Sequence, residues 1–396
     1  MSGRVLFCQP RRNRAGAALT LVFVGVLVAG AATGSLPGAP AGAARKSPAQ
    51  ASGSAPAADA AGRHEEVARA AAEAMADGTS PMEAAERAVS RSGDRWGAVY
   101  SPGEYEEFQE SLDGRYTGVG LRARRERDGR IDITGVQTGS PAAGAGIREG
   151  DRLRSVDGRT VDGLPVTDVV SLLRGDADDA PAGTAVTLGL QRGTRAWTET
   201  LRRARLSTDS VTVRRPADGV TVIRVAAFTK GVGEQVRTAV RHSPPASGFV
   251  LDLRGNSGGL VTEAVSTASV FLDGGLVATY DVDGRQRALH ADSGGDTARP
   301  LVALVDGGTM SAAELLAGAL QDRGRAVVVG SRTFGKGSVQ MPSRLPDGSV
   351  AELTVGHYRT PSGRAVDGRG ITPDLDAGPD ALSRARTVLG GLGDQS

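Results

Sequence analysis

The chain has 396 residues, which is enough for two or three domains with sizeable hydrophobic cores. Its 47 Lys and Arg residues almost balance its 45 Asp and Glu residues, and this interspersed charge gives no basis for nucleic-acid binding. A single cysteine excludes a disulfide framework, and the four histidines form none of the usual zinc-binding spacings. We therefore expect no metal and no other cofactor.

The N-terminus has the pattern of an export signal. Arginines precede an apolar run at 15–32, AGAALTLVFVGVLVAGAA, and small-residue cleavage sites follow it. The run is also about long enough to span a bilayer, so the sequence leaves open whether residues 1–32 are cleaved or remain as a membrane anchor. Both outcomes place the protein outside the cytoplasm. Residues 33–60 are rich in Ala, Pro, Ser and Gly, and we predict that they form a disordered linker.

Helical patterns fill the next region, 61–115. HEEVARAAAEAMADG (64–78) predicts a helix that ends at a glycine, and SPMEAAERAVSRSG (80–93) has Ser-Pro at its start and Gly at its end. SPGEYEEFQESLDG (101–114) predicts only a short helical turn. We assign these helices to packing and assembly rather than to a site.

From Tyr116 the pattern changes to short strands, with one helix predicted at 168–175, DVVSLLRG. The segment 116–206 resembles a PDZ domain of bacterial processing proteases through its GVGL, SPA and DG motifs. The resemblance implies that backbone N–H groups of one loop bind a peptide C-terminus, which then adds as a strand beside the helix. The alternative is a small β domain whose glycines serve only turns. The residues of the implied carboxylate-binding loop are Gly118, Val119, Gly120 and Leu121.

Apolar strands and helices alternate through the rest of the chain. TVIRVAAF (221–228), GFVLDLRGNSGGL (248–260), LVALV (301–305) and AVVVG (326–330) are nearly continuous apolar runs. Such runs separated by helices predict a parallel sheet that is buried on both faces.

Ser311 and Lys336 are the candidates for chemistry in this region. Ser311 opens the helix AAELLAGAL, where backbone N–H groups and the helix dipole can hold an oxyanion. Lys336 lies between glycines in FGKG, and burial there would lower its pKa enough for it to act as a base. Two simpler interpretations stay open: Ser311 could be an N-cap that forms a capping box with Glu314, and Lys336 could be a solvated or anion-binding lysine. GKGS lacks the spacing of a P-loop.

Three motifs in fixed order, DLRGNSGG, SAAELLAGALQD and TFGKGSVQ, resemble the carboxyl-terminal processing proteases, serine peptidases of family S41. The resemblance covers about residues 60–380. It implies a multidomain α/β fold in which a protease core of the ClpP/crotonase type, 207–385, follows the inserted PDZ β-domain and the N-terminal helices. A C-terminal tail is expected at 386–396.

The same resemblance implies the roles of individual residues. Ser311 matches the nucleophile, Lys336 the general base, and Gln340 the residue that orients the lysine. The backbone N–H groups of Gly258 and Ala312 match the donors of the oxyanion hole.

Asp322 matches an acidic position with a supporting role. The sequence departs from the family pattern beside the site, with Ser257 in place of the usual proline and Thr309 in place of a serine. A Ser/His/Asp triad is the competing chemistry. None of the four histidines lies in a glycine-rich turn after a buried strand, and we assign His357, which follows the strand ELTV, a structural role at the strand end rather than that of a base.

Together these observations predict an exported serine endopeptidase whose PDZ domain recognises the free, apolar C-terminus of a protein substrate. Two alternatives come from other classes: a catalytically silent PDZ scaffold, and a retinoid- or lipid-binding module on the same core. Intact Ser311, Lys336 and Gln340 argue against both. The resemblance is also compatible with a homodimer formed through the terminal helices.

Overall fold

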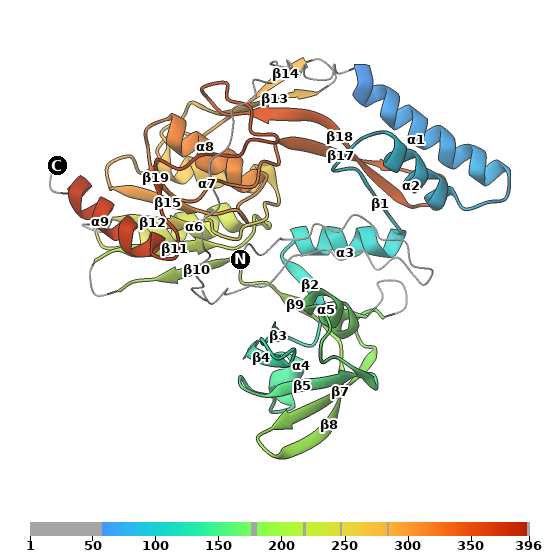
Figure 1. Ribbon diagram of the computed structural model, residues 1–396. Helices are drawn as coiled ribbons and strands as arrows, with labels where there is room; N and C mark the ends of the chain where they lie inside the picture. The colour runs from blue at the N-terminus through green and yellow to red at the C-terminus, as the bar shows by residue number, and fades with distance from the viewer. Residues whose placement is uncertain (1–57, 176–179, 217–218, 246–247, 283–284, 394–396) are drawn as a thin grey trace, which may run out of the picture.

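The computed structural model describes residues 58–175, 180–216, 219–245, 248–282 and 285–393. The predicted export signal and the linker as far as residue 57 lie outside these residues. Figure 1 shows three parts: an α/β core, a β-domain attached below it, and N-terminal helices beside a long two-stranded arm. None of the helices in the described ranges is both long and apolar enough to cross a membrane.

The core is a six-stranded sheet that is parallel except for its first strand. Every residue of its two central strands is buried, which confirms the predicted sheet covered on both faces. In spatial order the strands are β10 (Val211–Arg214), β11 (Thr221–Val225), β12 (Phe249–Asp252), β15 (Leu301–Val305), β16 (Val327–Gly330) and β19 (Leu375–Asp376).

Helices cover both faces of this sheet. Alternate strand residues pack against three helices on one face and against the last helix on the other. The three helices are α6 (Val232–Arg241), α7 (Val261–Phe271) and α8 (Ala312–Asp322), and the last is α9 (Ala381–Gly393). Most of the expected C-terminal tail is therefore helix, because Ala385 and Leu389 of α9 bury their side chains on the sheet.

A second sheet links the core to the N-terminal helices. Its longest strand, β18, runs from the core toward α1 and α2 (Figure 1). Val67, Ala85 and Val99 form a small separate core with Leu353 of β18. The elements are α1 (Ala58–Ala76), α2 (Pro81–Arg91), β1 (Ala98–Tyr100), β13 (Leu276–Val282), β14 (Arg285–His290), β17 (Ser338–Arg344) and β18 (Val350–Arg359).

The β-domain corresponds to the predicted PDZ segment and has its own hydrophobic core. Strand β3 lies at one edge of its sheet, in the order β3-β4-β5-β7-β8, and β6 pairs with β5. The elements are β3 (Leu121–Arg125), β4 (Ile131–Val136), α4 (Pro141–Gly144), β5 (Arg152–Val156), β6 (Arg159–Thr160), α5 (Val166–Arg174), β7 (Ala185–Arg192) and β8 (Arg195–Arg202).

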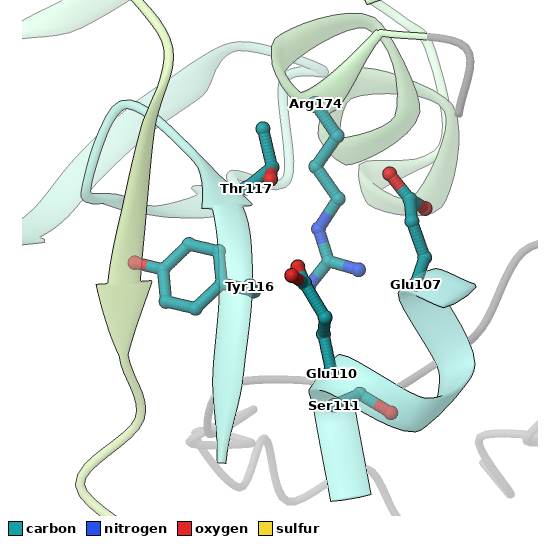
Figure 2. A pocket seen from close by; sticks show the side chains of 6 residues that line it. All are labelled: Glu107, Glu110, Ser111, Tyr116, Thr117 and Arg174. Atoms are coloured by element: carbon teal, nitrogen blue, oxygen red, sulfur yellow. The ribbon is translucent and has the colours of Figure 1, made fainter. Parts of the chain in front are cut away.

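A two-stranded ribbon and one helix form the root of this domain. The ribbon pairs β2 (Arg115–Gly118) with β9 (Ala204–Ser207), and α3 (Pro102–Leu112) lies against it. Figure 2 shows Arg174, the last residue of α5, extending between Tyr116 of the ribbon and Glu107 of α3. The domain is thus joined to the body by side-chain contacts as well as by the chain.

Most predicted elements are present, and three differences lie in the N-terminal region. Helix α1 begins at Ala58, inside the predicted linker. The predicted turn at 101–114 is the full helix α3, because Ser101 and Glu104 form a capping box around its first turn. The sequence analysis did not predict β1, whose three residues pair with β18 far along the chain.

Candidate active site

Ser311 lies at a sharp turn between β15 and α8. Its φ of 51° is positive, which is costly for a residue with a side chain and requires support from its surroundings. That support is present at both backbone groups of the residue. Its N–H donates to Glu314 Oε2 at 2.9 Å, and its carbonyl accepts the Tyr358 hydroxyl at 2.8 Å.

Lys336 lies in the loop between β16 and β17. Its N–H donates to Glu314 Oε2 at 2.8 Å, and its carbonyl accepts the same Tyr358 hydroxyl at 3.2 Å. The glycines on either side let this loop pack closely on the segment 366–370. A methyl group on Gly337 would lie 2.5 Å from the backbone nitrogen of Asp367, so a larger residue does not fit there.

Glu314 joins these two segments and is completely buried. Its other oxygen, Oε1, accepts hydrogen bonds from the Gly335 N–H at 2.7 Å and the Thr333 hydroxyl at 2.5 Å. Burial raises the pKa of Glu314, and the hydrogen bonds that it accepts oppose this rise. Glu314 therefore does far more than complete a capping box, because it ties the turn at Ser311 to the loop that carries Lys336.

The amine of Lys336 lies over an aromatic ring from the N-terminal region. Lys336 Nζ is 5.1 Å from the centroid of the Trp96 ring, within the range of a cation–π contact. Burial lowers the pKa of Lys336 below its ordinary value of 10.5. The negative charges of Glu352 and Asp94 raise this pKa, but by less than burial lowers it. Within the described ranges no hydrogen bond joins the side chains of Lys336 and Ser311.

Gln340 contacts the lysine site through Trp96. Its Nε2 donates to the Trp96 carbonyl at 3.2 Å, although 244 residues separate the two positions. Asp94 fixes the same turn, because its carboxylate accepts N–H groups from Trp96 and Thr354 at 3.0 and 2.7 Å. Sequence reasoning missed this turn, since nothing within residues 94–97 indicates contact with a loop so distant along the chain.

The glycine loop after β12 approaches Ser311 from the other side. A methyl group on Gly258 would lie 2.9 Å from Ser311 Cβ and 3.3 Å from the Ala312 nitrogen, which explains the need for glycine. The Gly258 N–H donates to Asn256 Oδ1 at 2.8 Å. Among the described residues the Ala312 N–H donates to no acceptor, and it lies in the first turn of α8, where N–H groups lack helical partners.

A charged cluster holds the start of this loop. The carboxylate of Asp252 accepts two hydrogen bonds from Arg254, at Nε and Nη2, and one from Arg224. Asp306 accepts the Gly255 N–H at 2.8 Å and so joins the loop to the turn before Ser311. These contacts lie on the segments that sequence analysis singled out, but their side-chain partners were not predicted.

Two other candidate residues lie away from Ser311. Asp322 is at the opposite end of α8, about 16 Å along the helix by its rise per residue. It accepts hydrogen bonds from the N–H and the hydroxyl of Ser362. His357 Nε2 lies 3.8 Å from Asp367 Oδ2, and no hydrogen bond within the described part of the chain joins it to Ser311. The triad that sequence analysis left open gains no support.

The loop predicted to bind a carboxylate lies between β2 and β3 of the β-domain, and its backbone hydrogen bonds set the direction of its N–H groups. The Val119 and Gly120 carbonyls accept the N–H groups of Ala142 and Gln137. In a trans peptide the N–H points opposite to the carbonyl, so the Gly120 and Leu121 N–H groups face away from these partners. Gly120 needs its glycine, because its φ is 82° and a methyl group there would lie 2.2 Å from Ser140 Cβ.

Comparisons with known proteins agree with this architecture. The model of peptidase family S41 matches residues 219–377, and a PDZ domain model matches 133–192. The chain is 34% identical over 307 residues to carboxyl-terminal-processing peptidase 3 of Arabidopsis thaliana chloroplasts, covering 72% of this chain and 58% of that protein. It is 32% identical to the carboxy-terminal processing protease CtpA of Bacillus subtilis, and the match covers 68% of this chain and 58% of that protein.

Among solved structures, the photosystem II D1 C-terminal processing protease is 30% identical and has a TM-score of 0.50, with 78% of this chain and 86% of that one covered. The chain spans about three fifths of the length of the curated relatives just named. The S41 match at residues 219–377 includes the glycine loop, the Ser311 turn and the Lys336 loop. The chain therefore belongs to peptidase family S41, among its carboxyl-terminal processing members that carry a PDZ domain.

Proposed function

We propose that the protein is an exported serine endopeptidase that uses Ser311 and Lys336 and recognises substrates by their C-termini. The observation that carries the proposal is the double clamp formed by Glu314 and Tyr358. Both residues are buried, and each bonds to the backbone of Ser311 and of Lys336. A packed helix end alone would not require a serine in a strained backbone conformation that shares its hydrogen-bond partners with the half-buried Lys336.

The proposed reaction begins with a neutral Lys336, which the lowered pKa favours. The Lys336 amine takes the proton of the Ser311 hydroxyl while the Ser311 oxygen attacks the scissile carbonyl. The resulting oxyanion is stabilised by the Ala312 N–H and by a donor of the glycine loop. The Lys336 ammonium returns its proton to the leaving amine, and water, with Lys336 again as the base, releases the acid and restores Ser311.

This reaction requires the lysine amine to move. Its position over Trp96 leaves it without a hydrogen bond to Ser311, so a change of the Lys336 side-chain rotamer must precede turnover. Gln340 bonds to the carbonyl of Trp96 and can then orient the amine from the adjacent strand. A substrate that seats beside Trp96 would favour this change.

The β-domain is proposed to receive the substrate C-terminus. The outward N–H groups of Gly120 and Leu121 can hold the terminal carboxylate, and the open edge of β3 can pair with the substrate backbone. Leu121 and Leu172 lie partly exposed over the core of the domain, which favours an apolar terminal residue.

The decisive experiment measures cleavage of an unfolded protein with an apolar C-terminal tail. We expect turnover by the full chain, and its loss in Ser311→Ala and in Lys336→Ala when both variants keep their thermal unfolding midpoints. His357→Ala is the matched control and should retain activity. Turnover that survives Ser311→Ala would refute the proposed nucleophile.

A binding scaffold would give a different result. Calorimetry would then detect a C-terminal peptide with the parent and with Ser311→Ala, while the parent showed no turnover of any tailed substrate. Amidation of the peptide terminus provides the control, because it removes the carboxylate that the loop of Gly120 would bind.

The proposal of export depends on the apolar run at 15–32 with the arginines before it. Protease added to intact producing cells, or to their medium, should reach the full chain. A chain that lacks residues 1–32 should stay protected inside the cells. Protection of both chains would contradict the proposal.

A further inference from the structure

Ser338 is a buried serine whose hydroxyl has no hydrogen-bond partner. The residue is 4% exposed, and among the residues that the structure describes its Oγ neither donates nor accepts a hydrogen bond. A buried polar group without a partner costs free energy, so it requires an explanation such as a role in catalysis. Ser338 begins β17, two residues after Lys336 in the motif GKGSVQ.

Strand geometry places this hydroxyl between the lysine and Gln340. The Tyr358 N–H donates to the Gly337 carbonyl at 2.9 Å, which continues the pairing of β17 with β18 by one residue toward Lys336. Alternate residues of an extended strand face the same side. Lys336, Ser338 and Gln340 therefore share one face of this segment.

Contacts of the two outer residues agree with this placement. Lys336 Nζ and Gln340 Nε2 both contact Trp96, the first over its ring at 5.1 Å from the centroid and the second at its carbonyl at 3.2 Å. Val339, on the opposite side of β17, packs against the protease core. The unpaired hydroxyl of Ser338 thus lies on the same side of the strand as the Lys336 amine.

Gln340 offers a second acceptor on this face. Because a carbonyl only accepts, the Trp96 carbonyl fixes the NH₂ end of the Gln340 amide and leaves Oε1 at the other end. Within the described part of the chain this oxygen takes part in no hydrogen bond. Two acceptors, Ser338 Oγ and Gln340 Oε1, are therefore present on the face that carries Lys336.

We propose that Ser338 is a positioning residue for the general base: its Oγ accepts one N–H of the neutral Lys336 amine while Gln340 Oε1 accepts the other. A neutral primary amine has two N–H groups and one lone pair, so two acceptors leave the lone pair to take the Ser311 proton. The ammonium then has three N–H groups, one for each acceptor and one that passes to the leaving amine. This inference rests on the proposed peptidase activity and adds a residue to which the family resemblance assigned no role.

Ser338→Ala separates this role from a structural one. If the hydroxyl only fills space, its removal relieves an unpaired buried group, and neither stability nor turnover should fall. We expect the thermal unfolding midpoint to stay unchanged or to rise. We expect kcat to fall by about 10- to 10²-fold with little change in KM, which is part of the contribution of about 10²- to 10⁴-fold that a general base makes.

The pH profile of kcat is a readout that packing alone would not move. The Ser338 hydroxyl bonds more strongly to the ammonium than to the neutral amine, so its removal should lower the pKa of Lys336 in the substrate complex. The midpoint of the kcat profile should therefore move to lower pH, by up to about 1 unit. Glu352 and Asp94, whose charges raise the same pKa, are unchanged in this variant.

Ser338→Cys and Ser243→Ala are the matched controls. A thiol has nearly the shape of a hydroxyl group but is a weak acceptor, so the cysteine variant should lose kcat as the alanine variant does, and it carries the test if the alanine variant does not fold. Ser243, after α6, donates its hydroxyl to the Ala239 carbonyl at 2.7 Å. Ser243→Ala should lower the unfolding midpoint but leave kcat and its pH midpoint unchanged.

The outcomes separate the two proposals. The inference about Ser338 alone would be overturned if turnover depends on Ser311 and Lys336 but Ser338→Ala keeps its kcat, or loses kcat without the shift in pH midpoint. A parent without turnover that depends on Ser311 would overturn the proposed function and this inference with it.

Discussion

A single buried carboxylate, Glu314, connects the two segments that carry the proposed dyad. It accepts four hydrogen bonds, two at each oxygen, from donors that come from the Ser311 turn and the Lys336 loop. A carboxylate is suited to this position because it only accepts, whereas an amide of the same shape presents donors on one side.

Glu314→Gln is therefore expected to destabilise the protein although it conserves shape. The NH₂ group of the glutamine would face two N–H or O–H donors. The loss of two charge-assisted hydrogen bonds should lower the free energy of unfolding by about 3 kcal/mol or more. Thermal unfolding should show a lowered midpoint, and turnover should fall more steeply than stability. Glu234→Gln, on the exposed face of α6, is the control and should be close to neutral. Equal midpoints for Glu314→Gln and the parent would contradict this account.

The pH profile of turnover tests the state of Lys336. Burial lowers its pKa, so kcat/KM should rise with pH to a plateau, with a midpoint below 10.5. The negative charge of Glu352 raises that pKa, so Glu352→Gln should move the midpoint to lower pH. An upward shift in this variant would show that Glu352 does not act on the lysine through its charge.

The same group affects stability with a definite sign. In the unfolded chain the lysine keeps its proton up to about pH 10.5, whereas in the folded chain it releases the proton at lower pH. The unfolded state therefore binds more protons between the two pKa values, and the contribution of Lys336 to stability increases with pH across that window.

At the scale of elements, the root of the PDZ domain is held by arginines against the acidic helix α3. Arg174 of α5 lies 5.6 Å from the Tyr116 ring centroid and beside Glu107, as Figure 2 shows. Arg205 of β9 binds Glu110 at 2.7 Å. Burial lowers the pKa of Arg174, whereas the charges of Glu107 and Tyr116 raise it. Arg174 is therefore a cation enclosed between two parts of the molecule.

Removing this enclosed cation should loosen the root of the domain. In Arg174→Ala we expect amide hydrogen exchange in α3 and β2 to quicken by about tenfold, equivalent to about 1.4 kcal/mol of local opening. Arg159→Ala, exposed on β6, is the matched control. Unchanged exchange in α3 would mean that the ribbon alone holds the domain in place.

Across the whole molecule, the hydrophobic cores are separate. Among the residues that the structure describes, the buried cluster of the PDZ domain shares no residue with the clusters of the protease core or of the N-terminal helices. Domains with independent cores commonly unfold in separate steps, so calorimetry of the full chain should resolve more than one transition.

A peptide with an apolar C-terminus should raise only one of these transitions. Binding to the folded PDZ domain stabilises it by about 2.7 kcal/mol at a peptide concentration one hundred times Kd. The amidated peptide is the control and should shift none. A shift of the core transition alone would place the peptide at Ser311 instead of at the loop of Gly120.

The sequence by itself determined the parts that depend on local patterns. Continuous apolar runs predict the burial of β12 and β15 on both faces of the sheet. Ser311 at a helix start and Lys336 between glycines suggest a Ser/Lys dyad from local sequence alone. These features depend on neighbouring residues, so they can be read along the chain. Helix α9 was missed because its apolar positions are diluted by Gly and Arg.

Only the tertiary structure decided how these parts are held together. Trp96 lies beside a lysine 240 positions further along the chain, Glu314 gathers donors from loops that no local pattern connects, and Asn256 takes the N–H that family resemblance assigned to the oxyanion. The contacts of Trp96 and of Glu314 join segments that are far apart along the chain. Packing of the whole fold fixes their geometry. For this reason the sequence predicted Ser311 and Lys336 as candidates but not the groups that position them.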